Sequence, residues 1–318
     1  MNDAGPGRQT EKIDDLRPHK THPPPRHTQN RPPSPPGRGQ ERVREIHKTP
    51  MVSQLKKIQS WYDVRGVVLP LRHEKILLLA DTHVGYEVEL RRERGINIIS
   101  QTNRLVEKIL ELADFHNVSS VAILGDVKHE LPIPRESIDE VKTFLRAIAK
   151  KVPLLLIPGN HDSLLQEIAA DIEGVEITSA RGVLLNKFLL LHGHVKPVAQ
   201  DLEKAEVIVM GHTHPAVVIR DEIGYTVKEP AILKIYTSRT KLCKSLYGEP
   251  CKRRGKISIV ILPAAHPLIT GVDVKEIPQL ISSGRTILKH IEWNAENIEV
   301  YLTDMTFLGT LADLQNVA

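Results

Sequence analysis

The sequence predicts an α/β protein, a layered α/β/β/α sandwich that follows a disordered N-terminal tail. Two observations support this fold class. From about residue 60 to residue 172, apolar strands alternate with helices, whereas after residue 172 strands follow one another with short connections. The strands are also continuously apolar, which indicates sheets that are covered on both faces. A chain of 318 residues, of which 41% are hydrophobic, is long enough to bury such a core.

Apolar runs and helical spacing place the elements in order. Strands are predicted in eleven segments: 64–71, 75–80, 119–125, 152–159, 175–178, 182–186, 187–193, 205–211, 216–221, 256–262 and 298–304. Helices are predicted in three segments: most of 87–116, then 135–151 and 162–171. In the first of these helices, Leu105, Ile109 and Leu112 recur at helical spacing.

The predicted domains are a disordered, Pro-rich basic tail over residues 1–55 and one folded domain over residues 56–318. The tail contains HPPPRHTQNRPPSPPGRGQ, and a segment with so many prolines and no aromatic residue cannot form a packed core. Residues 1–50 hold ten basic and six acidic side chains, which accounts for the whole net charge of +4. Met51, at the end of this stretch, is an alternative start of the native chain.

Composition argues against several classes of protein. No apolar run approaches the roughly 20 residues that a membrane span needs, and the N-terminus carries no apolar signal-peptide core. We therefore expect a cytoplasmic protein that does not enter a membrane. The folded part has no net charge, which argues against a dedicated nucleic-acid binder. Cys243 and Cys251 are not spaced as a CxxC pair, so two reduced thiols are expected, with a disulfide as the alternative.

Polar side chains follow five of the predicted apolar strands, at the point where each strand ends. They are Asp81 and His83, then Asp126 and His129, then Asn160, His161 and Asp162, then His192 and His194, and finally His212 and His214. Any one of these clusters is more often a hydrogen-bonded loop than a site. Five of them at the carboxyl ends of strands, the edge where open α/β sheets bind ligands, predict one shared site.

The residue types in these clusters favour metal ions. Carboxylate and amide oxygens together with imidazoles, and no thiolate, suit borderline divalent cations such as manganese, iron, cobalt or zinc. The donors outnumber the ligands that one ion normally takes, so two ions that share Asp126 as a bridging carboxylate are expected. Glycines flank the donors in GD, GN, HG and GH, and glycine permits the close backbone approach that such convergence needs.

The five motifs DxH, GDxxH, GNHD, HGH and GHTH, in this order, resemble the calcineurin-like metallophosphoesterase superfamily over roughly residues 65–265. The stretches DTHVGYE, GDVKHE and LPAAHPLITG further resemble its prokaryotic branch, which is related to DNA-repair nucleases and DNA-ligase-associated phosphoesterases. The resemblance implies seven metal ligands: Asp81, His83 and His214 on the first ion, Asp126 between the ions, and Asn160, His192 and His212 on the second.

The resemblance also implies catalytic roles. His161 would stand near the leaving-group oxygen and donate a proton to it, and Asp126 would be catalytic through its bridging position. His194 would contact the substrate or a ligand rather than a metal. Many relatives carry Asp where this chain has His129, and that Asp orients the catalytic histidine. Here His129 or the following Glu130 would orient His161.

These features predict a dinuclear phosphoesterase. Two cations would neutralise the phosphoryl charge, lower the pKa of a bridging water and align hydroxide for in-line attack, while His161 would protonate the leaving oxygen. Manganese is the expected metal, with iron, cobalt, nickel or zinc as alternatives. The expected substrate is a phosphodiester in a nucleotide or at a short or single-stranded nucleic-acid end. A phosphomonoesterase, or a non-catalytic nucleic-acid repair accessory with the same fold, is the alternative.

Overall fold

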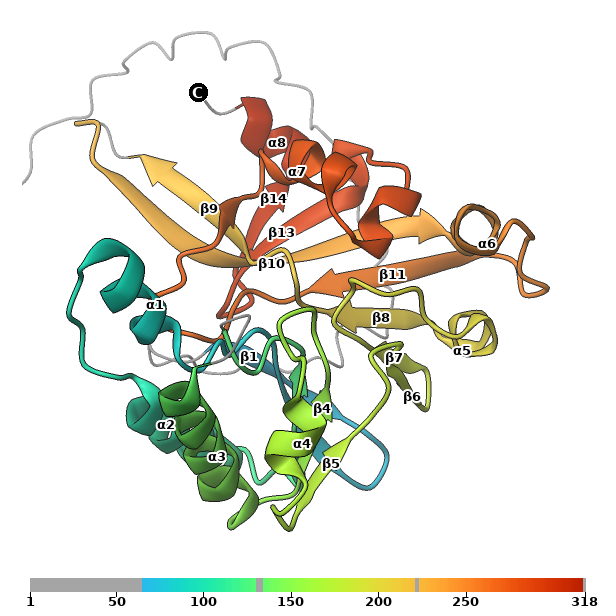
Figure 1. Ribbon diagram of the computed structural model, residues 1–318. Helices are drawn as coiled ribbons and strands as arrows, with labels where there is room; N and C mark the ends of the chain where they lie inside the picture. The colour runs from blue at the N-terminus through green and yellow to red at the C-terminus, as the bar shows by residue number, and fades with distance from the viewer. Residues whose placement is uncertain (1–64, 130–133, 221–222, 317–318) are drawn as a thin grey trace, which may run out of the picture. The chain divides into compact units, whose positions relative to one another are not determined.

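The computed structural model describes residues 65–129, 134–220 and 223–316 (Figure 1). The predicted tail, Met51 and Glu130 lie outside the described residues. The first of two sheets has five strands, in the order β1-β2-β3-β4-β5. Their bounds are β1 Gly66–Pro70, β2 Lys75–Leu79, β3 Ser120–Leu124, β4 Leu154–Ile157 and β5 Val175–Ile177.

The second sheet has nine strands, ordered β12-β9-β10-β11-β8-β7-β6, with β13 paired to β10 and β14 to β13. Their bounds are β6 Val183–Leu185, β7 Phe188–Leu190, β8 Val207–Met210, β9 Pro215–Arg220, β10 Thr226–Ser238, β11 Lys256–Ile261, β12 Val272–Asp273, β13 Ile298–Leu302 and β14 Phe307–Thr310. The long strand β10 is central because β9, β11 and β13 all pair with it.

Helices connect and cover these strands. The α-helices are α1 Tyr86–Arg94, α2 Thr102–Phe115, α3 Arg135–Ala149, α4 Leu165–Ala169, α5 Ala199–Lys204, α6 Arg239–Tyr247, α7 Ile277–Ser283 and α8 Leu311–Asn316; two 3₁₀ helices are η2 Ile287–His290 and η3 Ala295–Asn297. None of the helices in the described ranges has the length and apolar character needed to cross a membrane.

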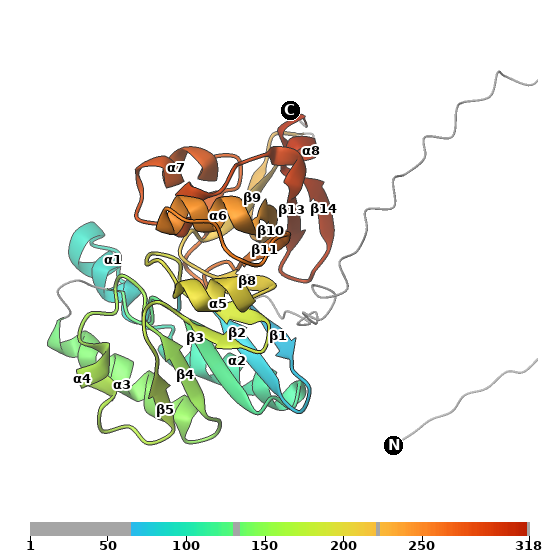
Figure 2. The same cartoon turned by 90° about the vertical axis from the view of Figure 1, so that its right-hand side faces the viewer.

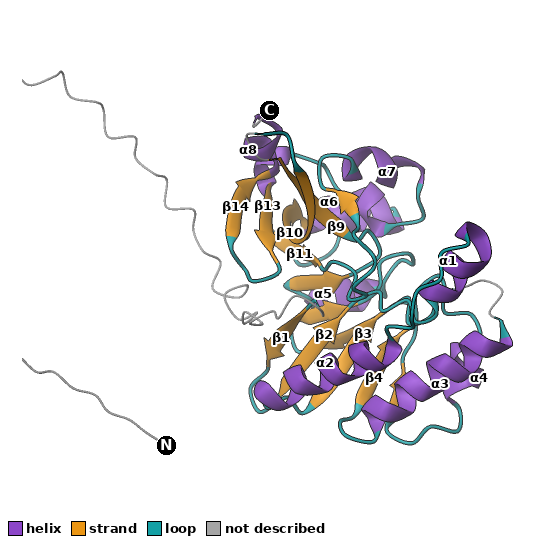
Figure 3. Ribbon diagram, turned by 90° about the vertical axis from the view of Figure 1, so that its left-hand side faces the viewer, coloured by secondary structure: helices purple, strands orange, loops and turns teal. Residues whose placement is uncertain are grey.

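The side chains of the first sheet alternate between its two faces, and each face borders a different core. Leu77 and Leu79 of β2 join the core beneath α2 and α3, whereas Ile76 and Leu78 point to the opposite face. The helices meet this core through their regularly spaced apolar side chains, among them the predicted Leu105 and Ile109 of α2. Figure 3 shows α2 and α3 lying along one face of the first sheet.

The opposite face of the first sheet packs against the second sheet. Leu78 and Leu124 belong to one core cluster with Phe188 and Val209 of the second sheet. The outer face of the second sheet forms a third cluster with α5, α6 and α7. Figure 2 shows α6 and α7 together beside this sheet. Three cores between four layers confirm the predicted α/β/β/α sandwich.

Two parts of the element prediction need correction. The segment 87–116 is two helices rather than one, because Gly95 ends α1 in the left-handed conformation with φ of 64°. In the second half, helices α5 to α8 and the long strand β10 were not predicted. Cys243 and Cys251 are joined in a disulfide, the alternative to the expected free thiols, with Cα atoms 5.5 Å apart.

Parallel pairing brings the predicted strand ends together. Strands β2, β3 and β4 run parallel to one another in the first sheet, as do β7 and β8 in the second. Their carboxyl ends therefore meet at one edge of the sandwich. The backbone of this edge is also joined across the motifs, since Val84 and Val127 are hydrogen-bonded at 2.8 Å.

Candidate metal centre

Four of the predicted ligands form a compact first donor set. The ligand atoms of Asp81, His83, Asp126 and His214 lie within 4.8 Å of one another. His214 Nε2 is 3.3 Å from both His83 Nε2 and Asp81 Oδ2. His83 Nε2 is 3.8 Å from Asp126 Oδ2. Apart from His214, all of these side chains are buried, so the set has the low solvent exposure typical of a metal centre.

The remaining predicted ligands form a second donor set around His192. Its Nε2 lies 3.0 Å from Asn160 Oδ1, 3.0 Å from His212 Nδ1 and 3.5 Å from Asp126 Oδ2. The two sets therefore share the Asp126 carboxylate. All seven residues predicted as ligands are brought together at one edge, from both sheets of the sandwich.

The tautomers in the second set leave lone pairs that face one another. His192 Nδ1 lies 3.0 Å from the carbonyl of Leu124, and His212 Nε2 lies 3.1 Å from the carbonyl of Arg285. If both rings are neutral and carry their protons on those two nitrogens, His192 Nε2 and His212 Nδ1 face each other as lone pairs. Such a pair is repulsive unless a positive charge lies between the nitrogens, so these residues fit a bound cation.

Charges around Asp81 support the same assignment. Burial alone would raise the pKa of Asp81, but His214 and His192 outweigh burial and lower it, so this buried carboxylate stays ionised. Its buried Oδ1 lies 3.2 Å from His192 Nδ1. Burial likewise opposes protonation of His192, yet the hydrogen bond and charge of Asp81 raise its pKa to about 9. The donor set thus attracts positive charge.

The backbone at the strand ends is held in an unusual conformation. Nine non-glycine residues in the described ranges have positive φ, and five of them are predicted ligands: Asp81, His83, Asp126, His212 and His214. Each such residue costs about 1–3 kcal/mol and persists only where its surroundings enforce it. The conformation turns each side chain sharply off its strand toward the shared edge.

Two glycines permit this convergence. A Cβ on Gly125, which has φ of 85°, would overlap the ring of His192. A Cβ on Gly159 would overlap both the carboxylate and the backbone of Asp126. The close approach predicted from the glycine-flanked motifs is thus confirmed at these two positions.

Asp162, the last residue of GNHD, joins two of the ligand-bearing loops. Its buried carboxylate accepts hydrogen bonds from the backbone N–H of Gly159 at 2.7 Å, and of Val127 and Lys128 at 3.2 Å each. Burial and the nearby charge of Asp126 raise its pKa. Sequence analysis gave Asp162 no role, although its place in the motif was a signal that could have revealed one.

His161 is oriented by a backbone carbonyl. Its Nδ1 donates a 2.5 Å hydrogen bond to the carbonyl oxygen of His129, and the two rings stack with centroids 5.7 Å apart. The His129 side chain is engaged elsewhere, with Nε2 2.5 Å from Glu89 Oε2 and Nδ1 3.1 Å from His83 Nδ1. Of the two predicted candidates, His129 contacts His161, and it does so through its main chain as well as its ring.

The site is closed on one side and open on the other. Asp81, His83, Asp126 and His192 are buried, whereas Asn160 is exposed and His161, His212 and His214 are half-buried. A substrate can therefore approach from the side of His161. His194 lies beside the second donor set, with its ring centroid 5.1 Å from that of His192.

Comparison with known proteins places this site in a family. Residues 75–236, about half of the chain and all seven predicted ligands, match the calcineurin-like phosphoesterase superfamily domain. No curated protein sequence matches the chain.

Two solved structures are similar at low identity. Nuclease MPE of Pseudomonas putida is 19% identical with a TM-score of 0.44, and the match covers 76% of this chain and 89% of that one. Yfce, a phosphoesterase from E. coli, is 17% identical with a TM-score of 0.34, covering 74% of this chain and 97% of that one. Likeness at this level does not identify a substrate.

Proposed function

Because the chain belongs to the calcineurin-like phosphoesterase superfamily, and is therefore a metal-dependent hydrolase, we propose that it hydrolyses phosphodiesters in nucleotides or at nucleic-acid ends. Two divalent cations are the proposed cofactors. Asp81, His83 and His214 would hold one, Asn160, His192 and His212 the other, and Asp126 would bridge them. Manganese as the native metal and a cytoplasmic location stay predictions.

One observation carries the proposal. The Asp126 carboxylate lies between two donor sets, with Oδ2 3.8 Å from His83 Nε2 and 3.5 Å from His192 Nε2. When bound there, two cations would supply charge neutralisation at the phosphoryl group and acidify a water nucleophile. A single structural ion would not need seven donors, since closed structural sites typically use four.

His161 is the proposed proton donor. Because its Nδ1–H is held by the carbonyl of His129, Nε2 is the nitrogen left for the substrate. As the P–O bond to the leaving group breaks, the proton on Nε2 would pass to the leaving oxygen. The backbone N–H of His161 donates a 2.9 Å hydrogen bond to Asp126 Oδ1, which ties the position of this histidine to the donor sets.

The preference for diesters rests on the three stretches that resemble the nuclease-related branch. DTHVGYE and GDVKHE are joined at the Val84–Lys128 β-bridge. LPAAHPLITG contacts the first of these, since buried His266 Nε2 lies 3.4 Å from buried Glu87 Oε1. Ala265 N also donates to the carbonyl of Ala80, the residue before that stretch, at 2.7 Å. Motifs that are separate in sequence are thus contiguous around one side of the site, which supports treating them as one functional unit.

The test is hydrolysis of bis(p-nitrophenyl) phosphate and p-nitrophenyl phosphate, side by side, with Mn²⁺, and with Asp126→Asn as the control. We expect turnover of the diester that the control loses. Turnover of the monoester alone would replace the proposal with a phosphomonoesterase. Silence of the wild type on both esters, with metal bound, would contradict the catalytic proposal and favour the non-catalytic accessory.

A further inference from the structure

A second concave site adjoins the second donor set. It is a cavity of about 130 Å³ lined by His194, Lys196, Arg285, Thr286, Ile287, Lys289 and His290. We name this the basic pocket. Three of its residues are Lys or Arg, two are His, and none of the seven is acidic. It therefore favours an anion, and of its side chains only His194 has an expected role so far, as a contact to the substrate or to a metal ligand.

The size of the basic pocket limits what it can hold. A single water occupies about 30 Å³ of liquid volume, and pockets for drug-sized ligands measure about 300–1,000 Å³. A cavity of about 130 Å³ lies below the range for drug-sized ligands and is large enough for a compact ionic group. Three Lys or Arg side chains line the pocket, and side chains of this kind bind phosphate groups.

The basic pocket is connected to the metal centre by short interactions. The rings of His192 and His194 have centroids 5.1 Å apart. The carbonyl of Arg285 accepts the hydrogen bond from His212 Nε2 at 3.1 Å, and the N–H of Ile287 donates to the carbonyl of Gly193 at 2.9 Å. A phosphate in the pocket would therefore lie next to the one bound at the metals.

Two cationic and polar side chains of the pocket are held in place by helix α6. Lys196 Nζ donates to the carbonyl of Leu246 at 2.7 Å, and His290 Nδ1 lies 2.9 Å from Ser245 Oγ. Burial and the charges of Lys196 and Lys289 lower the pKa of His290. The pocket is thus a gathered set of donors rather than separate solvated side chains.

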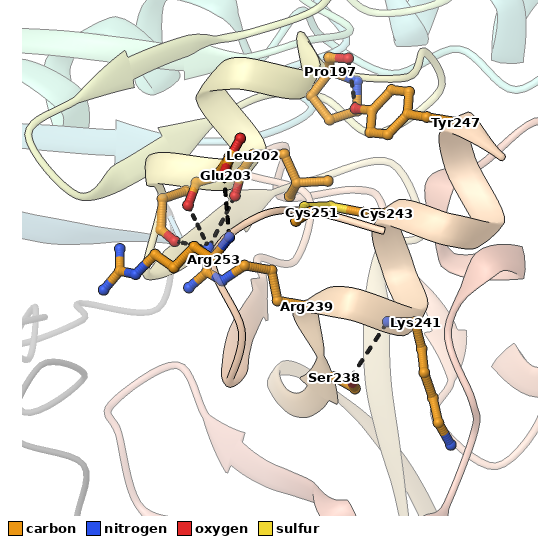
Figure 4. Close-up of a disulfide and its surroundings, with 11 residues drawn as sticks. Pro197, Leu202, Glu203, Ser238, Arg239, Lys241, Cys243, Tyr247, Cys251 and Arg253 are labelled. Atoms are coloured by element: carbon orange, nitrogen blue, oxygen red, sulfur yellow. Dashed lines mark hydrogen bonds between the residues drawn. A yellow bond between two sulfur atoms is a disulfide. The ribbon is translucent and has the colours of Figure 1, made fainter. Parts of the chain in front are cut away.

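Helix α6 is itself fixed at both ends (Figure 4). At its start, buried Arg239 donates to the carbonyls of Leu202 at 2.9 Å and Glu203 at 3.2 Å. From its middle, the Cys243–Cys251 disulfide ties it to the segment that leads to β11, and at its last residue Tyr247 donates to the carbonyl of Pro197 at 2.8 Å. These interactions hold the wall of the basic pocket against the loop that carries Lys196.

We propose that the basic pocket binds a second phosphate group of the substrate, next to the phosphate that is hydrolysed. This inference rests on the proposed phosphodiesterase function and narrows it to substrates that carry at least two phosphates. The second phosphate can belong to the next nucleotide of a nucleic-acid strand or to the polyphosphate of a nucleotide. Simple diesters such as bis(p-nitrophenyl) phosphate leave the pocket empty.

The experiment compares Lys289→Gln, Lys196→Gln and the double variant with wild type, and uses Lys150→Gln as the matched control. Lys150 is an exposed lysine at the end of α3, on the first sheet's outer layer, so its replacement removes the same charge away from the pocket. KM and kcat are measured on bis(p-nitrophenyl) phosphate, on oligothymidylates of two to eight nucleotides, and on thymidine 5′-triphosphate. Binding of a labelled oligothymidylate is measured by anisotropy in the Asp126→Asn background over a series of salt concentrations.

We expect the double variant to raise KM for a substrate with two or more phosphates by about tenfold, with kcat and the simple diester unchanged. The salt slope of strand binding should fall by about 0.7 for each phosphate that the variant no longer neutralises. An effect on oligothymidylates assigns the second phosphate to a strand, and an effect on the triphosphate alone assigns it to a nucleotide. Both results support the pocket.

Two results would overturn parts of this picture separately. Unchanged KM and unchanged salt slope in the double variant, with the simple diester hydrolysed normally, would remove the second phosphate site and leave the proposed function intact. Absence of all hydrolysis in the wild type would contradict the proposed function, and the anisotropy data would still decide whether the pocket binds phosphate. Because Lys196 also contacts Leu246, Lys289→Gln alone must show the same direction of effect.

Discussion

The metal centre and the basic pocket are neighbours that are held in opposite ways. At the candidate metal centre, the main chain fixes the donors. Five of the predicted ligands have positive φ values, and two glycines let neighbouring chain segments approach closely. At the basic pocket, Lys196 and His290 are each positioned by a single hydrogen bond to one helix. Under the two proposals, the residues at the strand ends would carry out the reaction and the side chains of the basic pocket would select the substrate.

The largest effect on turnover is expected at the candidate metal centre. Asp126→Asn removes the one carboxylate that both donor sets share. We therefore expect kcat for bis(p-nitrophenyl) phosphate to fall by at least about 1,000-fold, because one cation would no longer stabilise the charge of the transition state. The fold should persist, as measured by circular dichroism and thermal unfolding. Metal content per chain should fall from two toward one, and full activity in this variant would sink the dinuclear proposal.

A smaller effect is expected at the proton donor. His161→Gln keeps a polar side chain but cannot supply the proton, so for a diester with an alkyl leaving group we expect kcat to fall by about 100-fold, within the range of general acid catalysis. Metal content, measured by elemental analysis, should stay at the wild-type value. Loss of metal in this variant would instead make His161 a ligand and would assign the proton donor elsewhere.

A substrate with a better leaving group sharpens the same test. If His161 protonates the leaving oxygen, the decrease in kcat caused by His161→Gln should be small for a substrate that releases p-nitrophenolate, which departs without a proton. It should be large for a substrate that releases an alkyl alcohol. An equal deficit on both substrates would point to a positioning role for this side chain.

A substitution at Gly159 tests whether the close approach of the main chain to Asp126 is needed. Gly159→Ala places a Cβ against the Asp126 carboxylate and main chain, so either the GNHD loop or Asp126 must move. We expect a decrease of about 1–3 kcal/mol in the free energy of unfolding, typical of overpacking, and roughly a tenfold decrease in turnover. Gly224→Ala, where a Cβ meets nothing within 4 Å, is the control, although its φ of 88° adds backbone strain. Normal turnover in Gly159→Ala would show that close approach is not needed.

Sequence analysis predicted the convergence of the polar strand ends better than the contacts around them, and the reason is physical. Asp81, Asn160 and His212 end continuous apolar strands, and parallel strands bring such ends to one edge, so the convergence follows from local pattern. The orientation of His161 could not be predicted because its partner is a backbone carbonyl, which every residue possesses. The same limit hid the carbonyl of Arg285, which fixes the tautomer of His212.

The basic pocket could not be predicted for a different reason. Lys196 is nearly 100 residues away in sequence from Arg285 and Lys289, and the three belong to no periodic pattern. They meet because the segment at η2 pairs with the loop after β7, where the N–H of Ile287 donates to the carbonyl of Gly193 at 2.9 Å, a contact that single-sequence patterns do not determine. Likewise, the disulfide depends on the turn after α6, where Gly248 at φ of 85° brings Cys251 back to Cys243.

The smallest effect on turnover is expected from loss of the disulfide, which holds helix α6 next to the basic pocket. Replacing both Cys243 and Cys251 by Ala frees the end of α6, whose Ser245 and Leu246 position His290 and Lys196. Removal of a short cross-linked loop costs roughly 2–3 kcal/mol in the free energy of unfolding, measurable by urea denaturation. We expect KM for oligothymidylates to rise about threefold, because the pocket loosens while it keeps its charges, and the simple diester should be turned over normally. Wild type treated with a phosphine reductant should match the double variant without any change of sequence. An equal decrease on both substrates would mean that α6 supports the metal centre as well, and the proposed separation of reaction from substrate selection would then fail.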